Sequence, residues 1–184
     1  MPSARGSLDW SPALAHPHLL AAPVASALAA TASTGIAAAE VAPIDATLAD
    51  TAAFCAAYDV SLAASANCVI VAGTRAGETT YAAVMVLATH RADVNGVVRR
   101  HLGVRKISFA AHDDAVSLTG MEFGGITPIG LPDDWPVLVD AAVVAAGDVV
   151  IGSGIRGSKF LVRGAALADL PTAEVLDLAQ PAPA

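Results

Sequence analysis

The chain has 184 residues, a formal net charge of −7, a hydrophobic fraction of 55% and an aromatic fraction of 4%. This length fits one domain with an additional arm and is sufficient for a hydrophobic core. Asp140 and Asp148 interrupt the best apolar run, which therefore falls short of the roughly 20 uncharged residues that a membrane-spanning helix needs. The composition excludes such a helix.

The negative charge belongs to the two ends of the chain. Residues 1–74 carry a net charge of −4 and residues 164–184 carry −3, whereas residues 75–163 contain nine basic and nine acidic residues. An acidic protein is a poor candidate for nucleic acid binding, but residues 75–163 are neutral overall and are not excluded on this ground. There, residues 90–106 hold five Lys or Arg residues and one acid.

The sequence argues against secretion and against metal binding. Prolines and Asp9 interrupt the apolar stretch near the N-terminus, which is unlike a signal peptide. Cys55 and Cys68 form no CxxC motif and lie far in sequence from any histidine, so we expect neither a disulfide framework nor a zinc site. We expect a cytoplasmic protein that needs no metal and no cofactor.

In chain order, the first half predicts an irregular arm over residues 1–17 and a helix over 18–30, where apolar residues recur at a spacing of four. A short strand is expected over 38–45. Asp50 or the threonine after it then caps a helix over 51–60.

Two strands at 68–73 and 81–88 follow, joined by a hairpin connection over 74–80. Asp93 is suited to cap the next helix, and Gly103 is suited to end it.

The second half predicts one more helix, at 113–120, and strands at 104–110, 137–144, 148–154 and 158–164. Because helices and strands alternate irregularly, with hairpins among them, the pattern favours an α+β fold over a doubly wound parallel sheet.

We expect this domain to span residues 18–170 and a flexible tail to follow over 171–184. The tail contains the sequences PTAE and QPAPA.

Residues 120–132, GMEFGGITPIGLP, contain four glycines and two prolines. A plain connecting loop would be shorter and more polar. Two interpretations fit the residues equally: a rigid crossing between strands, or the backbone wall of a pocket.

The stretch GSGIRG at 152–157 matches the dinucleotide-binding pattern GxGxxG. That chemistry requires a helix directly afterwards, whose N-terminal amides hold the pyrophosphate. The residues that follow, SKFLVR, alternate with the period of a strand. We therefore interpret the motif as a glycine-rich turn between two strands.

No diagnostic catalytic motif is present: GxSxG, HExxH and the P-loop are all missing. His90, His101 and His112 stand next to charged residues and are expected at the surface. Cys68 opens an apolar strand and is expected to be a small core residue.

Three stretches, GGITPIGLP, VLVD and GSGIRGSKFLV, resemble in order the YbaK/EbsC and prolyl-tRNA synthetase associated domain family. Members hydrolyse misacylated tRNA. The resemblance covers about residues 40–170. The matched positions are Gly124, Gly125, Ile126, Thr127, Pro128 and Gly130 in the loop, and Ser153, Gly154, Arg156 and Gly157 in the turn.

The resemblance implies a mixed, partly barrel-like β-sheet flanked by helices, with a pocket beside the glycine loop for the terminal adenosine and a small aminoacyl group. Amides of Gly124 and Gly125 would then face the ester carbonyl. Asn67 and Thr127 would position the substrate. The implied substrate-binding residues are Ile126, Pro128, Ser153 and Gly154.

The sequence departs from the family at one position. Editing members typically carry a lysine where this chain has Asn67, so a positive charge is missing. Lys159 would replace that charge if its strand faces the pocket; otherwise it is a solvated lysine. Arg99 and Arg100 either contact tRNA phosphates or form an ordinary solvated helix face.

Two functions follow from these observations. The first is a trans-acting deacylase that removes a small amino acid, of the Ala or Cys on tRNA-Pro type, from the 3′ end of aminoacyl-tRNA. The second is a pocket domain that has lost catalysis and binds a small aminoacyl or nucleotide-like ligand or a protein partner. The sequence does not set the oligomeric state.

Overall fold

The computed structural model describes residues 2–31 and 35–181. Its helices are α1 (Ala22–Ala30), α2 (Thr51–Tyr58), α3 (Arg99–His101), α4 (His112–Thr119) and α5 (Ala141–Ala145). Its strands are β1 (Ser11–Pro12), β2 (Glu40–Pro43), β3 (Ala66–Arg75), β4 (Glu78–Leu87), β5 (His90–Ala92), β6 (Lys106–Phe109), β7 (Val137–Asp140), β8 (Asp148–Gly152), β9 (Ser158–Arg163), β10 (Ala173–Leu176) and β11 (Ala179–Pro181). None of these helices is long and apolar enough to cross a membrane.

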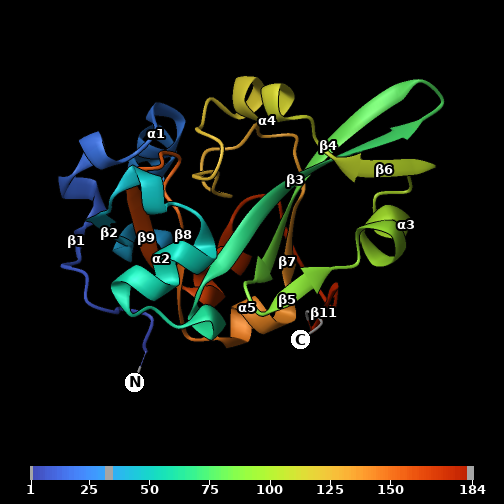
Figure 1. Ribbon diagram of the computed structural model, residues 1–184. Coiled ribbons are helices and arrows are strands. Elements are labelled where there is room, and N and C mark those ends of the chain that lie inside the picture. The colour runs from blue at the N-terminus through green and yellow to red at the C-terminus, as the bar shows by residue number, and fades with distance from the viewer. Residues whose placement is uncertain (1, 32–34, 182–184) are drawn as a thin grey trace.

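The described strands form three sheets. Their orders are β1-β2-β9-β8, β10-β7-β4-β3-β6 and β11-β5. The largest sheet is mixed, because β7 runs parallel to both β4 and β10 while β3 is antiparallel to its neighbours. A single bridge between Ser65 and Val150 links the two larger sheets, and the described strands do not close into a barrel. The expected α+β fold is confirmed (Figure 1).

The β3–β4 hairpin is the longest element of the fold and projects beyond the body of the domain (Figure 1). Its strands are longer than the sequence predicted, since they pair up to Arg75 and Glu78 and leave only two residues in the turn. Both turn residues have positive φ, 52° at Ala76 and 89° at Gly77. Two-residue turns of this kind match the twist of antiparallel strands.

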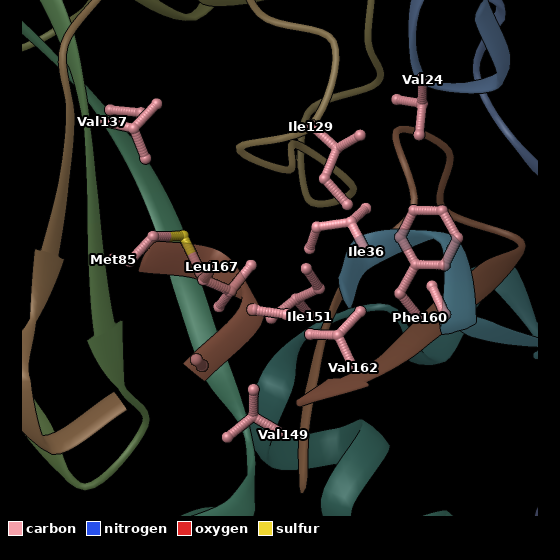
Figure 2. Packing of buried hydrophobic residues seen from close by; sticks show 14 of the residues in the cluster. Val24, Ile36, Met85, Ile129, Val137, Val149, Ile151, Phe160, Val162 and Leu167 are labelled. Carbon is pink, nitrogen blue, oxygen red and sulfur yellow. The ribbon is translucent and has the colours of Figure 1, made fainter. Parts of the chain in front are cut away.

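The main hydrophobic core lies between the two larger sheets. Met85 and Val137 contribute from one sheet, and Ile151 and Phe160 contribute from the other (Figure 2). α1 and the loop that follows α4 cover this core with Val24 and Ile129. The loop of residues 120–132 is therefore part of the core's enclosure as well as a connection.

The helix boundaries follow from capping residues. α1 begins at Ala22, later than expected, because Pro23 occupies its first turn, where a missing N–H costs nothing. Asp50 caps α2, as predicted, by accepting hydrogen bonds from two backbone amides. Asp93 likewise caps the following helix, whose first turn over 94–98 is a π-helix, and Gly103 follows it in the left-handed conformation.

The predicted strand at 137–144 is wrong in its second half. β7 ends at Asp140, whose side chain accepts a hydrogen bond from Ala142 N at 3.0 Å and so starts helix α5. The apolar run across this boundary is compatible with either structure, and the aspartate decides where the strand stops.

The chain ends also differ from a simple arm and tail. Residues 11–12 pair with β2, and residues 173–176 form β10 alongside β7. Residue 1 of the expected arm and residues 182–184 of the expected tail lie outside the described residues. Tertiary pairing accounts for the difference at the C-terminal side. The segment after Pro171 pairs with the edge of β7, and its own sequence carries no local signal for this strand.

Asp140 fixes this C-terminal segment. It is 4% exposed, and its second carboxylate oxygen accepts hydrogen bonds from Leu178 N at 3.0 Å and Ala179 N at 2.9 Å. One buried carboxylate thus accepts hydrogen bonds from an amide at the start of α5 and from two amides of the C-terminal segment.

We predict that Asp140→Ala lowers the free energy of unfolding by about 3 kcal/mol, because three buried or half-buried amides lose their acceptor. Urea unfolding of the variant measures this loss. Asp140→Asn keeps one acceptor oxygen and is expected to lose less. Equal stability of Asp140→Ala and the parent would contradict the role given to this carboxylate.

Candidate active site

A cavity of about 570 Å³ opens where the two larger sheets meet. Its floor is buried, with Val150 and Ile151 each 1% exposed, whereas Phe109 and Phe123 at its rim are 63% and 53% exposed. The other lining residues come from the start of α2, the first half of β3, the residue after β6, α4, the glycine loop, β8 and β9: Ala49, Asp50, Thr51, Ser65, Ala66, Asn67, Cys68, Val69, Ile70, Ala110, Ala115, Gly124, Ile126, Gly152 and Lys159.

The glycine loop forms one wall of this cavity because its backbone lies against the turn between β8 and β9. Gly154 N donates a hydrogen bond of 2.7 Å to Gly125 O. A Cβ at Gly125 would lie 2.5 Å from Ile155 O, so only glycine permits this approach. The two motifs that the sequence analysis treated separately are therefore one structural unit.

The loop offers one of the two amides that the resemblance implied. Gly125 N already donates to Glu122 O at 2.9 Å, so this amide is engaged within the loop. The N–H of Gly124, a lining residue, makes no hydrogen bond within the described part of the chain. Of the two amides, that of Gly124 is therefore the one without a partner among the described residues.

Arg156 anchors the loop from the β8–β9 turn. Its backbone N donates to Glu122 Oε2 at 2.6 Å, and its guanidinium donates to Phe123 O at 3.2 Å and to Ala46 O at 3.0 Å. The turn leads directly into β9, as expected from the strand period, with no helix to hold a pyrophosphate. The turn holds the pocket wall in place.

Besides Gly125, four of the predicted substrate-contacting residues do not line the cavity. The hydroxyl of Ser153 is buried and bonded to Ser158 Oγ at 2.6 Å, and Gly154 packs against α1. Thr127 Oγ1 is buried and has no hydrogen-bond partner within the described residues. Pro128 lines a different cavity, of about 450 Å³, beside α1. These four residues therefore lie outside the cavity wall.

Asn67 lies in the cavity wall and is held in a defined orientation. Thr51 Oγ1 donates a hydrogen bond of 2.7 Å to Asn67 Oδ1. With its oxygen engaged in this way, the side-chain NH₂ group is the part of Asn67 left for a ligand. Asp50, which also lines the cavity, caps α2 through Oδ1.

Lys159 faces the cavity and is 7% exposed, so the interpretation of a solvated lysine is wrong. Its Nζ donates to Ala49 O at 3.0 Å and lies 5.2 Å from the centre of the Phe54 ring. Burial lowers the pKa of Lys159, with a further lowering by Arg156 and opposing effects of Cys55 and Asp50. β9 thus brings an amino group to a pocket in which β3 supplies an uncharged amide.

Cys68 lines the same cavity, but burial raises the pKa of its thiol to about 12. A thiol with this pKa is not a nucleophile at neutral pH. Across the described residues, no three His, Cys, Asp or Glu side chains group into a metal site.

The family model of the aminoacyl-tRNA editing domain matches residues 45–170. The chain belongs to this family. The match covers the cavity lining from Ala49 to Lys159, and with it both glycine-rich motifs. No curated protein matches the chain.

Solved structures share the fold. A protein described as a candidate trans-editing enzyme for prolyl tRNA synthetase is 21% identical, with a TM-score of 0.72 over 94% of this chain and 99% of that one. The hypothetical protein APE2540 is 24% identical, with a TM-score of 0.64 over 75% and 86%. A scaffold used for epitope backbone grafting is 22% identical, with a TM-score of 0.73 over 87% and 97%.

Within this editing domain, sequence reasoning missed the pocket's aromatic rim and Thr51. Phe109 ends a short edge strand, and Phe123 precedes the glycines of the loop. The one sequence feature that could have drawn attention to these two phenylalanines is that aromatic residues are rare, at 4% of the chain. The Thr51–Asn67 hydrogen bond joins residues from two elements and has no local signature.

Arg99 and Arg100 lie outside the pocket lining of the editing domain, on exposed positions of α3. His90, His101 and His112 contact polar neighbours near the surface: Thr89, Glu174 and Asp113, respectively. None of these histidines lines the pocket.

We predict that stability conferred by Lys159 rises with pH. Because its pKa is lowered in the folded state, the unfolded chain binds more protons between that lowered pKa and 10.5. The cost of burying the charge is therefore fully present below this window and disappears as pH rises through it.

Urea unfolding of the parent and of Lys159→Met, from neutral pH to pH 10.5, measures this effect. The free energy of unfolding of the parent, relative to the variant, should increase with pH. The exposed Lys106→Met serves as control and should show no such trend. A difference that is flat or falls with pH for Lys159 would contradict the prediction.

Proposed function

We propose that this editing domain is a trans-acting deacylase that hydrolyses the ester between a small amino acid and the 3′ end of tRNA, of the Ala or Cys on tRNA-Pro type. The observation that carries the proposal is one cavity lined by Gly124, whose amide has no partner among the described residues, by Asn67 and by the buried Lys159. Its partner would be aminoacyl-tRNA, which places its work in the cytoplasm.

The chemistry needs stabilisation of the oxygen that becomes negative when water attacks the ester carbonyl. The Gly124 amide, fixed in the loop, would donate to that oxygen, and preorganised donors of this kind are a major source of ester-hydrolysis catalysis. Water adds to the carbonyl carbon, the bond to the ribose oxygen breaks, and the proton from water goes to that oxygen. The products are a free amino acid and a tRNA with a 3′-hydroxyl.

Lys159 would supply the charge that Asn67 does not. Its Nζ donates one hydrogen bond to Ala49 O, and an ammonium has three donors. The remaining donors are available to the developing oxyanion or to the ribose. Asn67, oriented by Thr51, would hold the substrate through its NH₂ group. The 2′-hydroxyl of the terminal ribose would assist water, as the resemblance to the family implies.

The second candidate function is ligand binding without turnover. One observation favours it: the side chain in the family's lysine position is uncharged and is tied to Thr51, while Lys159 is tied to Ala49 O. In this case the pocket would still hold an aminoacyl or nucleotide-like ligand.

A basic surface beside the pocket would bind the tRNA stem. Arg99 and Arg100 lie on α3, next to Arg75 at the end of β3, and Arg105 and Lys106 at the start of β6. All five are exposed, and none forms an ion pair with a described residue. β6 runs from this surface to Phe109 at the pocket rim, so the surface and the pocket are about 10 Å apart along one strand.

We predict hydrolysis of a small misacylated amino acid, measured on a panel that includes Ala-tRNA and Cys-tRNA of the proline isoacceptor. Gly125→Val should abolish turnover, because its side chain would meet Ile155 and displace the loop. Lys159→Ala should lower turnover by at least about tenfold, the effect of losing one charged donor.

Failure of the parent to hydrolyse any member of the panel would favour the binding function. Asn67→Lys separates the two cases: deacylation that appears only in this variant would mean that the natural protein is the binder. Circular dichroism confirms that each variant is folded.

We predict that tRNA affinity depends steeply on salt and that Arg99→Ala/Arg100→Ala reduces the slope of log K against log salt by about 1 to 2. Filter binding between low and physiological salt measures the slope. Arg5→Ala/Arg163→Ala removes the same charge elsewhere and should leave it unchanged. A flat salt dependence of the parent would contradict the tRNA surface.

A further inference from the structure

Two exposed aromatic side chains stand at one opening of the molecule. The exposed large hydrophobic side chains of the described residues are Leu14, Leu62, Phe109, Leu118, Phe123 and Val175. The two aromatic ones, Phe109 and Phe123, are the most exposed of these, and both line the same cavity. The other four lie outside its lining.

Phe123 is held in position although it is exposed. Its ring lies 4.7 Å from the ring of His112, measured between centroids, at an angle of 43°. Its carbonyl oxygen accepts the hydrogen bond from Arg156, and the engaged Gly125 amide fixes the loop just beyond it. An exposed ring that is positioned in advance loses little conformational freedom when it binds a ligand.

Phe109 reaches the cavity from a different element, since it is the last residue of β6. Its backbone is opposite Val71 of β3, and the next residue, Ala110, donates a hydrogen bond of 2.9 Å to Ile70 O. Because Ile70 and Ala110 also line the cavity, this pairing ties Phe109 to the pocket wall. The rim therefore has two independent anchors.

The chemistry of the rim differs from that of the floor. The floor and walls are built from small and aliphatic residues with a few polar groups, which suits an aminoacyl group and its ester. Flat, exposed rings instead suit a flat partner, and every nucleobase has a π face that stacks on an aromatic side chain.

We propose that Phe109 and Phe123 form a stacking site for the terminal nucleobase of the substrate. This inference rests on the proposed function, because it takes the ligand to be a 3′-aminoacylated nucleoside. The order of residues along the loop supports it, because Phe123 directly precedes Gly124. The base would stack on Phe123 while the ester carbonyl accepts a hydrogen bond from the adjacent Gly124 amide. The base would bind at the rim while the aminoacyl group enters the pocket.

The experiment uses two non-hydrolysable probes and measures their Kd by calorimetry. One probe is 3′-alanylamino-3′-deoxyadenosine, in which an amide replaces the ester. The other is the same compound with hydrogen in place of the base. The parent should bind the adenosine probe about tenfold more tightly than the abasic probe, which is within the range of a base–aromatic stack.

Phe109→Ala and Phe123→Ala should lose most of this preference while binding the abasic probe like the parent. Phe123→Leu, which keeps apolar surface without a π face, should behave like the alanine variant, and Phe123→Tyr should retain the preference. Leu118→Ala, an exposed residue of α4 outside the pocket, is the control and should leave both affinities unchanged.

The inference is overturned if the parent does not distinguish the probes, or if the phenylalanine variants keep its preference; a rim that serves a protein partner would give this second result. The outcome is separable from that of the proposed function. If the parent prefers the adenosine probe but does not deacylate aminoacyl-tRNA, the stacking site is supported and ligand binding without turnover becomes the favoured function. If the parent deacylates aminoacyl-tRNA and the phenylalanine variants bind both probes as the parent does, the deacylase function is supported and the stacking site is excluded.

Discussion

The close approach of two backbones, at Gly125 and the Gly154–Ile155 peptide, is the constraint on which the site depends. No side chain fits between them, and a hydrogen bond of 2.7 Å joins them. This contact ties the loop to the β8–β9 turn, where Arg156 adds two further hydrogen bonds to the loop and one to Ala46 O. As a result Phe123 and Gly124 are held at the pocket, although the loop itself has no regular secondary structure.

The pocket divides its polar groups between two sheets. Asn67 belongs to β3, whereas Lys159 belongs to β9; the sheets that contain them pack against each other through the hydrophobic core and are joined by the Ser65–Val150 bridge. Lys159 therefore brings an amino group into the cavity from a different sheet than the one that carries Asn67.

The sequence predicted what depends on local rules. Asp50 and Asp93 were identified as helix caps, and the strand after GSGIRG was identified from its period. It did not predict where the side chains of distant elements meet. Position in the family pattern indicated Thr127 and Ser153 as substrate contacts, but their side chains are buried behind the loop. Asn67, Gly124, Ile126 and Lys159 do share one cavity, because the glycine loop is tied to the β8–β9 turn beside the two strands that carry Asn67 and Lys159. Phe109 and Thr51 became visible only once β6 and α2 were placed against β3.

The position of β10 has a consequence for synthesis of the protein on the ribosome. β7 lies between β4 and β10, and β10 is formed by residues 173–176, near the end of the chain. Until those residues emerge, β7 presents an unpaired edge while the residues of the pocket are already made. Unpaired edges favour pairing with other chains. During synthesis the domain therefore passes through a stage in which the residues that line the pocket have been made but one edge of β7 is still unpaired, and pairing with β10 ends that stage.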